Sequence, residues 1–397
     1  MSTGLTLAAL QCCFTLTWTV YVAFLPALLA QAGLAPMWLP VLLVADQAVF
    51  VLADLAAGVA ADRAGSALHR LGPWLLGATA VSAVAFLALP FLAGSGAATW
   101  MLVATAVWAI SSAALRAPVA ALLGQRAARP ALPRLLAWWS LGLALASALG
   151  PWLTVQLRGG DARLPFVLAS MALLAATLAL LRVERQLPPP APAARGTLPR
   201  RGAALIVFLA AAAALGLGFQ AHAQLNATPM YLRFATAADL PGWLSLFWVA
   251  FALALWPAGE LTRRLGAVTA LGAGAALAAL GAALAAWAPA MAWLALGQAL
   301  SGAAWGVVMV SAWTAAVRFG HTGREGLSSA GLSSLLALAA LLRIAVVAAQ
   351  WPQQPAVQPW LAWLPVALWA LAAVLLVGAA QALRSGSQQA AQVEAAV

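Results

Sequence analysis

The sequence predicts an all-α membrane protein with twelve transmembrane helices in two pseudo-symmetric six-helix bundles. Apolar residues make up 65% of the 397 residues and charged residues only 7%, a composition too apolar for a soluble globular domain. Twelve long apolar runs follow one another, each near or above the ~20 residues that a spanning helix needs. A short polar motif recurs at equivalent places in the two halves of the chain, which indicates an internal duplication.

The apolar runs set the predicted spans and the predicted domain boundaries. The runs cover residues 7–30, 38–60, 71–93, 98–123, 134–156, 164–182, 203–230, 240–259, 265–288, 290–316, 327–349 and 359–382. We therefore expect an amino-terminal bundle over residues 1–182, a linker over 183–202, a carboxyl-terminal bundle over 203–383 and a tail over 384–397. The linker is rich in proline and arginine and cannot bury a core, so it marks the domain boundary.

The basic residues predict the orientation of the chain in the membrane. The net charge is +11, and the 20 basic residues are all arginine. If the amino terminus is cytoplasmic, most arginines fall in cytoplasmic loops, and the outer loops hold only Arg158, Arg163 and Arg233. The positive-inside rule then places both termini in the cytoplasm. We expect a polytopic protein of the inner (cytoplasmic) membrane of a bacterium, and the charge indicates orientation rather than binding to nucleic acid.

The repeated motif consists of a glycine, three residues, two polar or charged residues, one residue and a second glycine. Its copies comprise Gly58, Asp62, Arg63 and Gly65, and Gly259, Arg263, Arg264 and Gly266. Each copy follows an apolar run that opens on Leu-Pro, and one constant offset registers both the Leu-Pro pairs and the glycines. A glycine at the end of a span lets two helices approach closely, and a glycine in the loop permits a tight turn.

The first copy of this motif resembles the loop between helices 2 and 3 of the major facilitator superfamily of secondary transporters. Gly58, Asp62, Arg63 and Gly65 match that family pattern. The resemblance implies two bundles that rock about a site near the bilayer midplane, so that the site is exposed to one side and then the other. It also implies that the first, fourth, seventh and tenth helices line a central cavity, and that the second and eleventh helices face each other.

Polar side chains in the first and seventh spans are the candidate cavity residues, because polar groups at membrane depth belong against protein or water. They are Thr15, Trp18, Thr19 and Tyr21 in the first span, and Gln220, His222, Gln224 and Asn226 in the seventh. The resemblance places both clusters on the substrate path. The alternative is that these groups make only helix-to-helix hydrogen bonds, and the sequence leaves both readings open.

Four charged residues lie inside the predicted spans. Asp54 lies about 10 Å and Asp46 about 22 Å from the inner end of the second span, by helical rise. Arg116 in the fourth span is level with Asp54, and Arg343 in the eleventh is level with Asp46. Depth matching thus suggests an ion pair between Asp46 and Arg343 that closes the outer side. The alternative is that each charge is satisfied within its own half by backbone carbonyls or water.

The residue inventory argues against two classes of function. An enzyme needs a convergent catalytic set, but His222 is the one histidine in the spans and the carboxylates there are isolated. An ATP-driven pump needs a phosphate-binding loop with lysine, and the chain has no lysine. We expect no cofactor and no metal site. The partners expected are the lipid bilayer, a small-molecule substrate and a coupling ion, and the protein is expected to be a monomer.

The sequence therefore predicts a secondary transporter that works by alternating access. Protons are the expected coupling ion, because Asp46, Asp54 and His222 can titrate. The leading prediction is export of small amphipathic organic compounds. One alternative is proton-coupled uptake of an organic anion or another small metabolite, which the two buried arginines favour. A third reading, from a different class, is a transporter-like sensor or scaffold that moves nothing.

Overall fold

The computed structural model describes residues 3–64, 71–116, 119, 123, 130–184, 202–320 and 324–395. Every element of regular structure within these ranges is helical. Eleven helices there are long and apolar enough to cross a membrane, and one further apolar helix is shorter. The predicted all-α class is confirmed, and the protein is an integral polytopic membrane protein. Gly65 and most of the predicted linker lie outside the described residues.

The helices of the amino-terminal half, which we define as α1 to α7, follow the predicted runs. They are α1 (Thr3–Gln31), α2 (Trp38–Ala64), α3 (Leu71–Gly94), α4 (Ala98–Ser112), α6 (Leu132–Leu157) and α7 (Arg163–Glu184). A 3-10 turn, η2 (Ala113–Leu115), continues α4 and leads into Arg116. The fourth predicted span extends to residue 123, and most of its final turns lie outside the described ranges.

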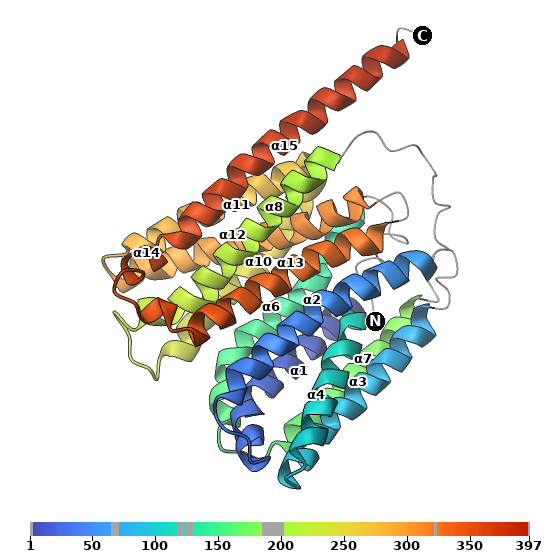
Figure 1. Cartoon of the computed structure of the whole chain (residues 1–397). Helices are drawn as coiled ribbons and strands as arrows, with labels where there is room; N and C mark the ends of the chain where they lie inside the picture. The colour runs from blue at the N-terminus through green and yellow to red at the C-terminus, as the bar shows by residue number, and fades with distance from the viewer. Residues whose placement is uncertain are drawn as a thin grey trace.

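The carboxyl-terminal half, α8 to α15, repeats this plan. Its elements are α8 (Gly202–Phe219), η3 (Gln220–Asn226), α9 (Ala227–Tyr231), α10 (Leu240–Leu265), α11 (Ala267–Trp287), α12 (Met291–Phe319), α13 (Glu325–Ala348), η4 (Trp351–Gln353), α14 (Gln358–Leu361) and α15 (Leu364–Ala395). The segment η3 is a π-helix, and it joins α8 and α9 into a single span. The helix α15 continues past the apolar span into the predicted tail, and Figure 1 shows it projecting beyond the other helices.

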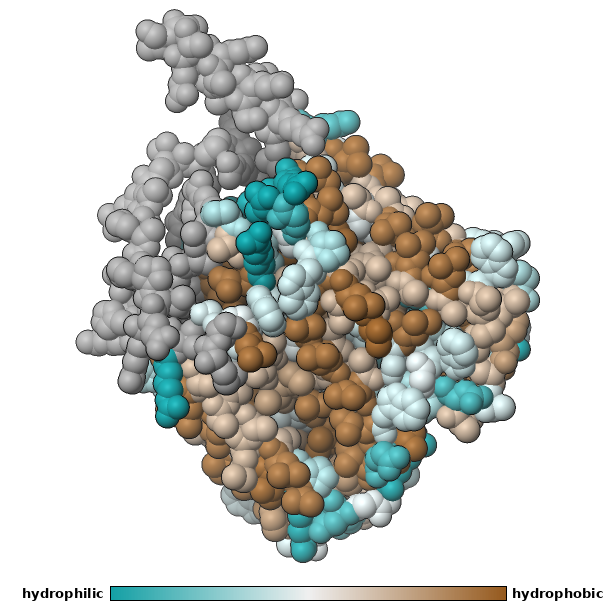
Figure 2. All heavy atoms as spheres, turned by 180° about the vertical axis from the view of Figure 1, so that it is seen from behind, coloured by the Kyte–Doolittle hydropathy of each residue, from teal (hydrophilic) through white to brown (hydrophobic). Residues whose placement is uncertain are grey.

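The outer surface is hydrophobic because these helices present large apolar side chains outward. Leu253 is 75% exposed, Val374 70% and Ile206 68%, and brown hydrophobic residues cover much of the face in Figure 2. In water such a surface would be unfavourable, whereas lipid tails solvate it. The backbone polar groups are satisfied within the helices, as hydrocarbon requires.

The two halves lie side by side (Figure 1) and meet along two helix pairs, α2 with α13 and α6 with α10. The helices α2 and α10 carry the two copies of the repeated motif, so each copy faces a helix of the opposite half. This is the contact pattern expected of a pseudo-twofold arrangement. We call the side where α1 begins and α2 ends the termini side, and the opposite side the far side.

Candidate functional site

A cavity of about 360 Å³ lies between the two halves, partway along the spans. Its volume falls within the range usual for small-molecule sites, ≈ 300–1,000 Å³. The residues that line it come from both halves: Gln11, Trp18, Gln47, Phe50, Asp54, Arg116, Trp139, Ser140, Leu143, Gln220, Gln224, Met309, Trp313, Ser333, Leu336, Ala337, Ala340, Arg343 and Ile344. Aromatic and aliphatic walls with a few polar and charged groups suit an amphipathic ligand.

An ion pair between Asp54 and Arg116 forms part of the cavity wall. The Arg116 Nε donates to Asp54 Oδ1 at 2.9 Å, and its Nη2 lies 2.8 Å from the same oxygen. The other carboxylate oxygen accepts from the hydroxyl of Ser333, on α13 of the opposite half. The guanidinium also lies over the ring of Phe50, 4.0 Å from its centroid. Asp54 thus links an arginine of one half to a helix of the other.

Arg343 supplies a positive charge on the opposite wall of the same cavity. Its Nε donates to Gln220 Oε1 at 2.9 Å, and both side chains line the cavity. Among the residues that the structure describes, no carboxylate lies within ion-pair distance of Arg343. An arginine has five N–H donors in a fork that fits a carboxylate or phosphate. The cavity therefore contains one cation that a bound anion can neutralise.

The π-helix η3 divides the predicted polar cluster of the seventh span. Gln220 and Gln224 line the cavity, whereas His222 is fully buried on the other side of the helix, 5.2 Å from the ring of Trp369. Asn226 donates to the backbone oxygen of Leu361 at 2.6 Å. The expectation that all four residues line the cavity is wrong for His222 and Asn226, because residues two apart point to opposite sides of a helix.

The predicted cluster of the first span divides in the same way. Trp18 lines the cavity, but Thr15, Thr19 and Tyr21 do not. Thr19 bonds the backbone oxygen of Thr15 at 3.2 Å. The hydroxyl of Tyr21 donates to Asp46 Oδ2 at 2.8 Å in the interior of the amino-terminal half. Tyr21 thus follows the alternative reading of a helix-to-helix hydrogen bond, whereas the hydrogen bonds of Thr15 and Thr19 lie within α1.

Asp46 and Arg343 do not pair in this conformation. Asp46 is bound to Tyr21 and Arg343 to Gln220, so each makes its hydrogen bond within its own half. The depths of the two residues match, but depth says nothing about the direction in which a side chain leaves its helix. The prediction of an Asp46–Arg343 contact therefore fails for this state, whereas the level pair of Asp54 and Arg116 does form an ion pair.

The first copy of the motif joins the two halves on the termini side. Asp62 accepts hydrogen bonds from the backbone nitrogens of Gly326 at 2.7 Å and Leu327 at 2.8 Å, in the first turn of α13. Those nitrogens have no partner within the helix, and the positive end of the helix dipole favours a carboxylate there. Gly58 lies against Gly326 and Ala330, with no room for a Cβ atom. Arg63 is exposed.

The second copy has a different chemistry at the equivalent place. Gly266 ends α10 with φ +83°, a conformation that favours glycine. Gly259 lies against α6, where a Cβ atom would be 3.5 Å from the backbone oxygen of Pro133. Arg263 and Arg264 hold the carboxylate of Glu260 on their own helix. Gly266 has a backbone conformation that suits the predicted turn, whereas the space at Gly259 would also admit a Cβ atom, and the arginines face a glutamate rather than a helix terminus.

Trp139, Trp313 and Ser333 are among the cavity residues that were not predicted from the sequence. Trp139 and Trp313 meet edge to face, with ring centroids 4.9 Å apart. Each lies about 10 Å from the termini-side end of its helix, by helical rise, so together they form a floor between α6 and α12. The third is Ser333. Its signal in the sequence was the group of serines Ser328, Ser329, Ser333 and Ser334, which recurs at helical spacing in an otherwise apolar helix.

The sequence matches the family profile described as Major Facilitator Superfamily over residues 7–343. The chain belongs to the major facilitator superfamily. Members of this superfamily are transporters rather than enzymes, so the family and the fold assign transport to the chain. A comparison with curated protein sequences gives no match.

Solved structures of superfamily transporters share the fold along nearly the whole chain. A bacterial homologue of the iron transporter ferroportin, in an outward-facing state, has a TM-score of 0.73 at 15% identity, covering 96% of this chain and 100% of that one. The human organic anion transporter MFSD10 (TETRAN) has a TM-score of 0.69 at 19% identity, covering 94% and 99%. The E. coli fucose:proton symporter FucP has a TM-score of 0.65 at 14% identity, covering 94% and 98%.

A leucine at position 58 should force the termini side apart. The new side chain would collide with Gly326 and Ala330, and overpacking of this kind costs about 1–3 kcal/mol. Spin labels placed near the end of α2 and the start of α13 should then report a longer distance. Gly77→Leu on α3 is the matched control, because a Cβ atom there meets nothing within 4 Å. An unchanged distance in Gly58→Leu would contradict this view of the closure.

Proposed function

We propose that this transporter moves a small amphipathic organic anion across the membrane by alternating access. The observation that carries the proposal is Arg343, which lines the cavity and has no carboxylate within ion-pair distance among the described residues. A carboxylate or similar group on the substrate would take that position. The aromatic side chains Trp18, Trp139 and Trp313 in the same lining suit the apolar part of such a molecule.

The comparison with known structures is compatible with this substrate class. MFSD10 is described as an organic anion transporter, and at 19% identity the likeness concerns the fold alone. The assignment of an anionic substrate therefore depends on the cavity of this chain. This assignment moves the leading sequence-based prediction, small amphipathic organic compounds of unspecified charge, toward the alternative that named an organic anion.

Proton coupling is the second part of the proposal, and Asp54 is the residue we assign to it. Its carboxylate joins Arg116 of its own half to Ser333 of the other half. Adding a proton to Asp54 would weaken both contacts at once, because a neutral carboxyl group is a poorer hydrogen-bond acceptor than a carboxylate and also loses its attraction to the Arg116 cation. Proton binding at this point would therefore favour movement of the halves. The neighbour FucP is described as a proton symporter.

The direction of transport, the orientation and the domain limits remain parts of the same proposal. We propose export, on the basis of Gly150 and Pro151 in α6, which resemble a fragment of an antiporter motif.

We propose cytoplasmic termini in a bacterial inner membrane, because arginines gather in the loops on the termini side. We also propose that the protein works as a monomer, with bundles over residues 1–182 and 203–383.

Transport by the purified protein in liposomes tests the proposal directly. Amphipathic carboxylic acids, their neutral amides and amines of similar size would be compared with and without an imposed pH gradient. We expect the acids to move, the amides to move at least tenfold more slowly, and collapse of the gradient to stop accumulation. Preference for amines or neutral compounds would overturn the anion assignment. Exchange of no compound at all would favour the sensor or scaffold reading.

A further inference from the structure

A second cavity, of about 430 Å³, lies on the termini side in the groove between α6 and α10. It is separate from the central cavity and shares no lining residue with it. Arg134, Glu260 and Arg264 form its polar part, and Trp138 and Trp256 form its apolar part. None of these side chains takes part in the transport function proposed above.

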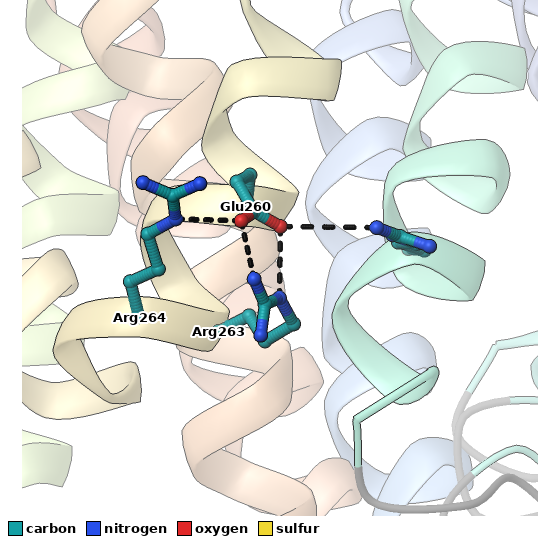
Figure 3. A network of polar contacts seen from close by, with 4 residues as sticks. Glu260, Arg263 and Arg264 are labelled. Carbon is teal, nitrogen blue, oxygen red and sulfur yellow. Dashed lines mark hydrogen bonds and ion pairs between the residues drawn. The ribbon is translucent and has the colours of Figure 1, made fainter.

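The charges at this groove do not cancel. Glu260 accepts from Arg263 Nε at 2.8 Å and from Arg264 Nε at 2.6 Å, and its carboxylate lies 3.8 Å from Arg134 Nη2 of the other half. Figure 3 shows Glu260 held in this way between its own helix and a neighbouring one. Three arginines thus surround one carboxylate. The side chains of Arg134 and Arg264 are 71% and 70% exposed, so their remaining N–H groups face outward.

The groove combines this positive charge with aromatic groups at a greater depth. Arg134 lies at the beginning of α6 and Arg264 at the end of α10, where the helices leave the apolar span. By helical rise, Trp138 lies about 6 Å deeper than Arg134, and Trp256 about 12 Å deeper than Arg264. The two indole rings meet edge to face with centroids 5.0 Å apart, and Trp256 is 53% exposed.

We infer that this groove binds an anionic phospholipid. The phosphate would lie between Arg134 and Arg264, since guanidinium groups bind phosphate oxygens in a bidentate manner. The upper part of an acyl chain would lie on Trp138 and Trp256, which form the apolar wall of the groove below the arginines. Arg134 and Arg264 belong to opposite halves, so a lipid bound to both would also stabilise the closed termini side.

Lipid titration of the purified protein in a neutral detergent tests this inference. Binding of phosphatidylglycerol and of phosphatidylcholine would be measured by native mass spectrometry and by the rise in melting temperature. We expect the wild type to prefer phosphatidylglycerol. Replacing one arginine, in Arg264→Gln, should weaken that binding roughly fivefold, and the double variant Arg134→Gln with Arg264→Gln roughly 25-fold, from about 1 kcal/mol per arginine.

Arg158→Gln is the matched control, because Arg158 is an exposed arginine at the opposite end of α6. It should retain wild-type binding of phosphatidylglycerol. The inference is overturned if the double variant binds as tightly as the wild type, or if the control loses as much as the double variant. It is also overturned if inorganic phosphate alone raises the melting temperature as much as the lipid does. If the double variant does not fold, the single variant Arg264→Gln decides the question by itself.

Discussion

Asparagine in place of Asp54 should abolish accumulation of substrate and lower the stability of the folded protein. The Asp54 side chain is 1% exposed and its partner Arg116 is 16% exposed. An asparagine would leave the guanidinium without a counter-charge in the interior, and breaking a buried ion pair in this way costs about 3–5 kcal/mol. The melting temperature and the uptake driven by a pH gradient would be measured on the same preparation.

The double variant Asp54→Asn with Arg116→Gln separates the two effects. Removing both charges should recover much of the stability, since no uncompensated cation remains. It should not recover accumulation if Asp54 carries the coupling proton. Asp161→Asn, which makes the same chemical change at an exposed position on the far side, should change neither quantity. Full accumulation by the double variant would remove Asp54 from the coupling mechanism.

Asp46 gives a second comparison within the same helix. An asparagine at this position can still accept the hydroxyl hydrogen bond of Tyr21, and no cation of the described ranges lies within ion-pair distance of Asp46. The two aspartates thus differ in their hydrogen-bond and ion-pair partners and not in their burial, since both are buried. This distinction was not accessible from the sequence, where both appear as isolated carboxylates in one span.

The fold could be predicted because each of its causes is local in the sequence. A run of apolar residues forms a helix in hydrocarbon whatever its neighbours are. The two motif copies then set the register of the halves, and the structure places them on α2 and α10, each facing the opposite half. The partner of Asp62 could not be deduced, because the donating backbone nitrogens of Gly326 and Leu327 belong to a helix terminus with no side-chain signal.

The site was harder to predict, because helical rise gives depth and not direction. Depth alone placed Asp54 level with Arg116, and their helices are neighbours, so the pair forms. The same reasoning failed for Asp46, whose side chain turns toward Tyr21. In the seventh span, every second residue from Gln220 to Asn226 was predicted to line the cavity, although Gln220 and His222 lie on opposite sides of the helix. Helical phase would have corrected this second error without a structure.

Glutamine in place of Arg343 should raise the KM for an organic anion roughly thirtyfold and leave the fold intact. A hydrogen bond to a charged group contributes about 2 kcal/mol. A glutamine can still bond Gln220, so no buried polar group loses its partner. Initial rates of transport against substrate concentration would be measured for an acid and for its neutral amide. The amide should show little change in KM, and Arg343→Lys should fall between the wild type and Arg343→Gln.

The main competing explanation is that Arg343 only holds Gln220 in position. In that case Arg343→Gln, which keeps a hydrogen bond to Gln220, would change the KM little, whereas Gln220→Ala, which removes that bond, would raise it. If Arg343 binds the substrate itself, Gln220→Ala keeps the cation and has the smaller effect. Arg163→Gln, at a far-side arginine that lies over Phe91 and outside the cavity, controls for the loss of charge alone. Equal losses for the acid and the amide would show that Arg343 does not recognise the anion.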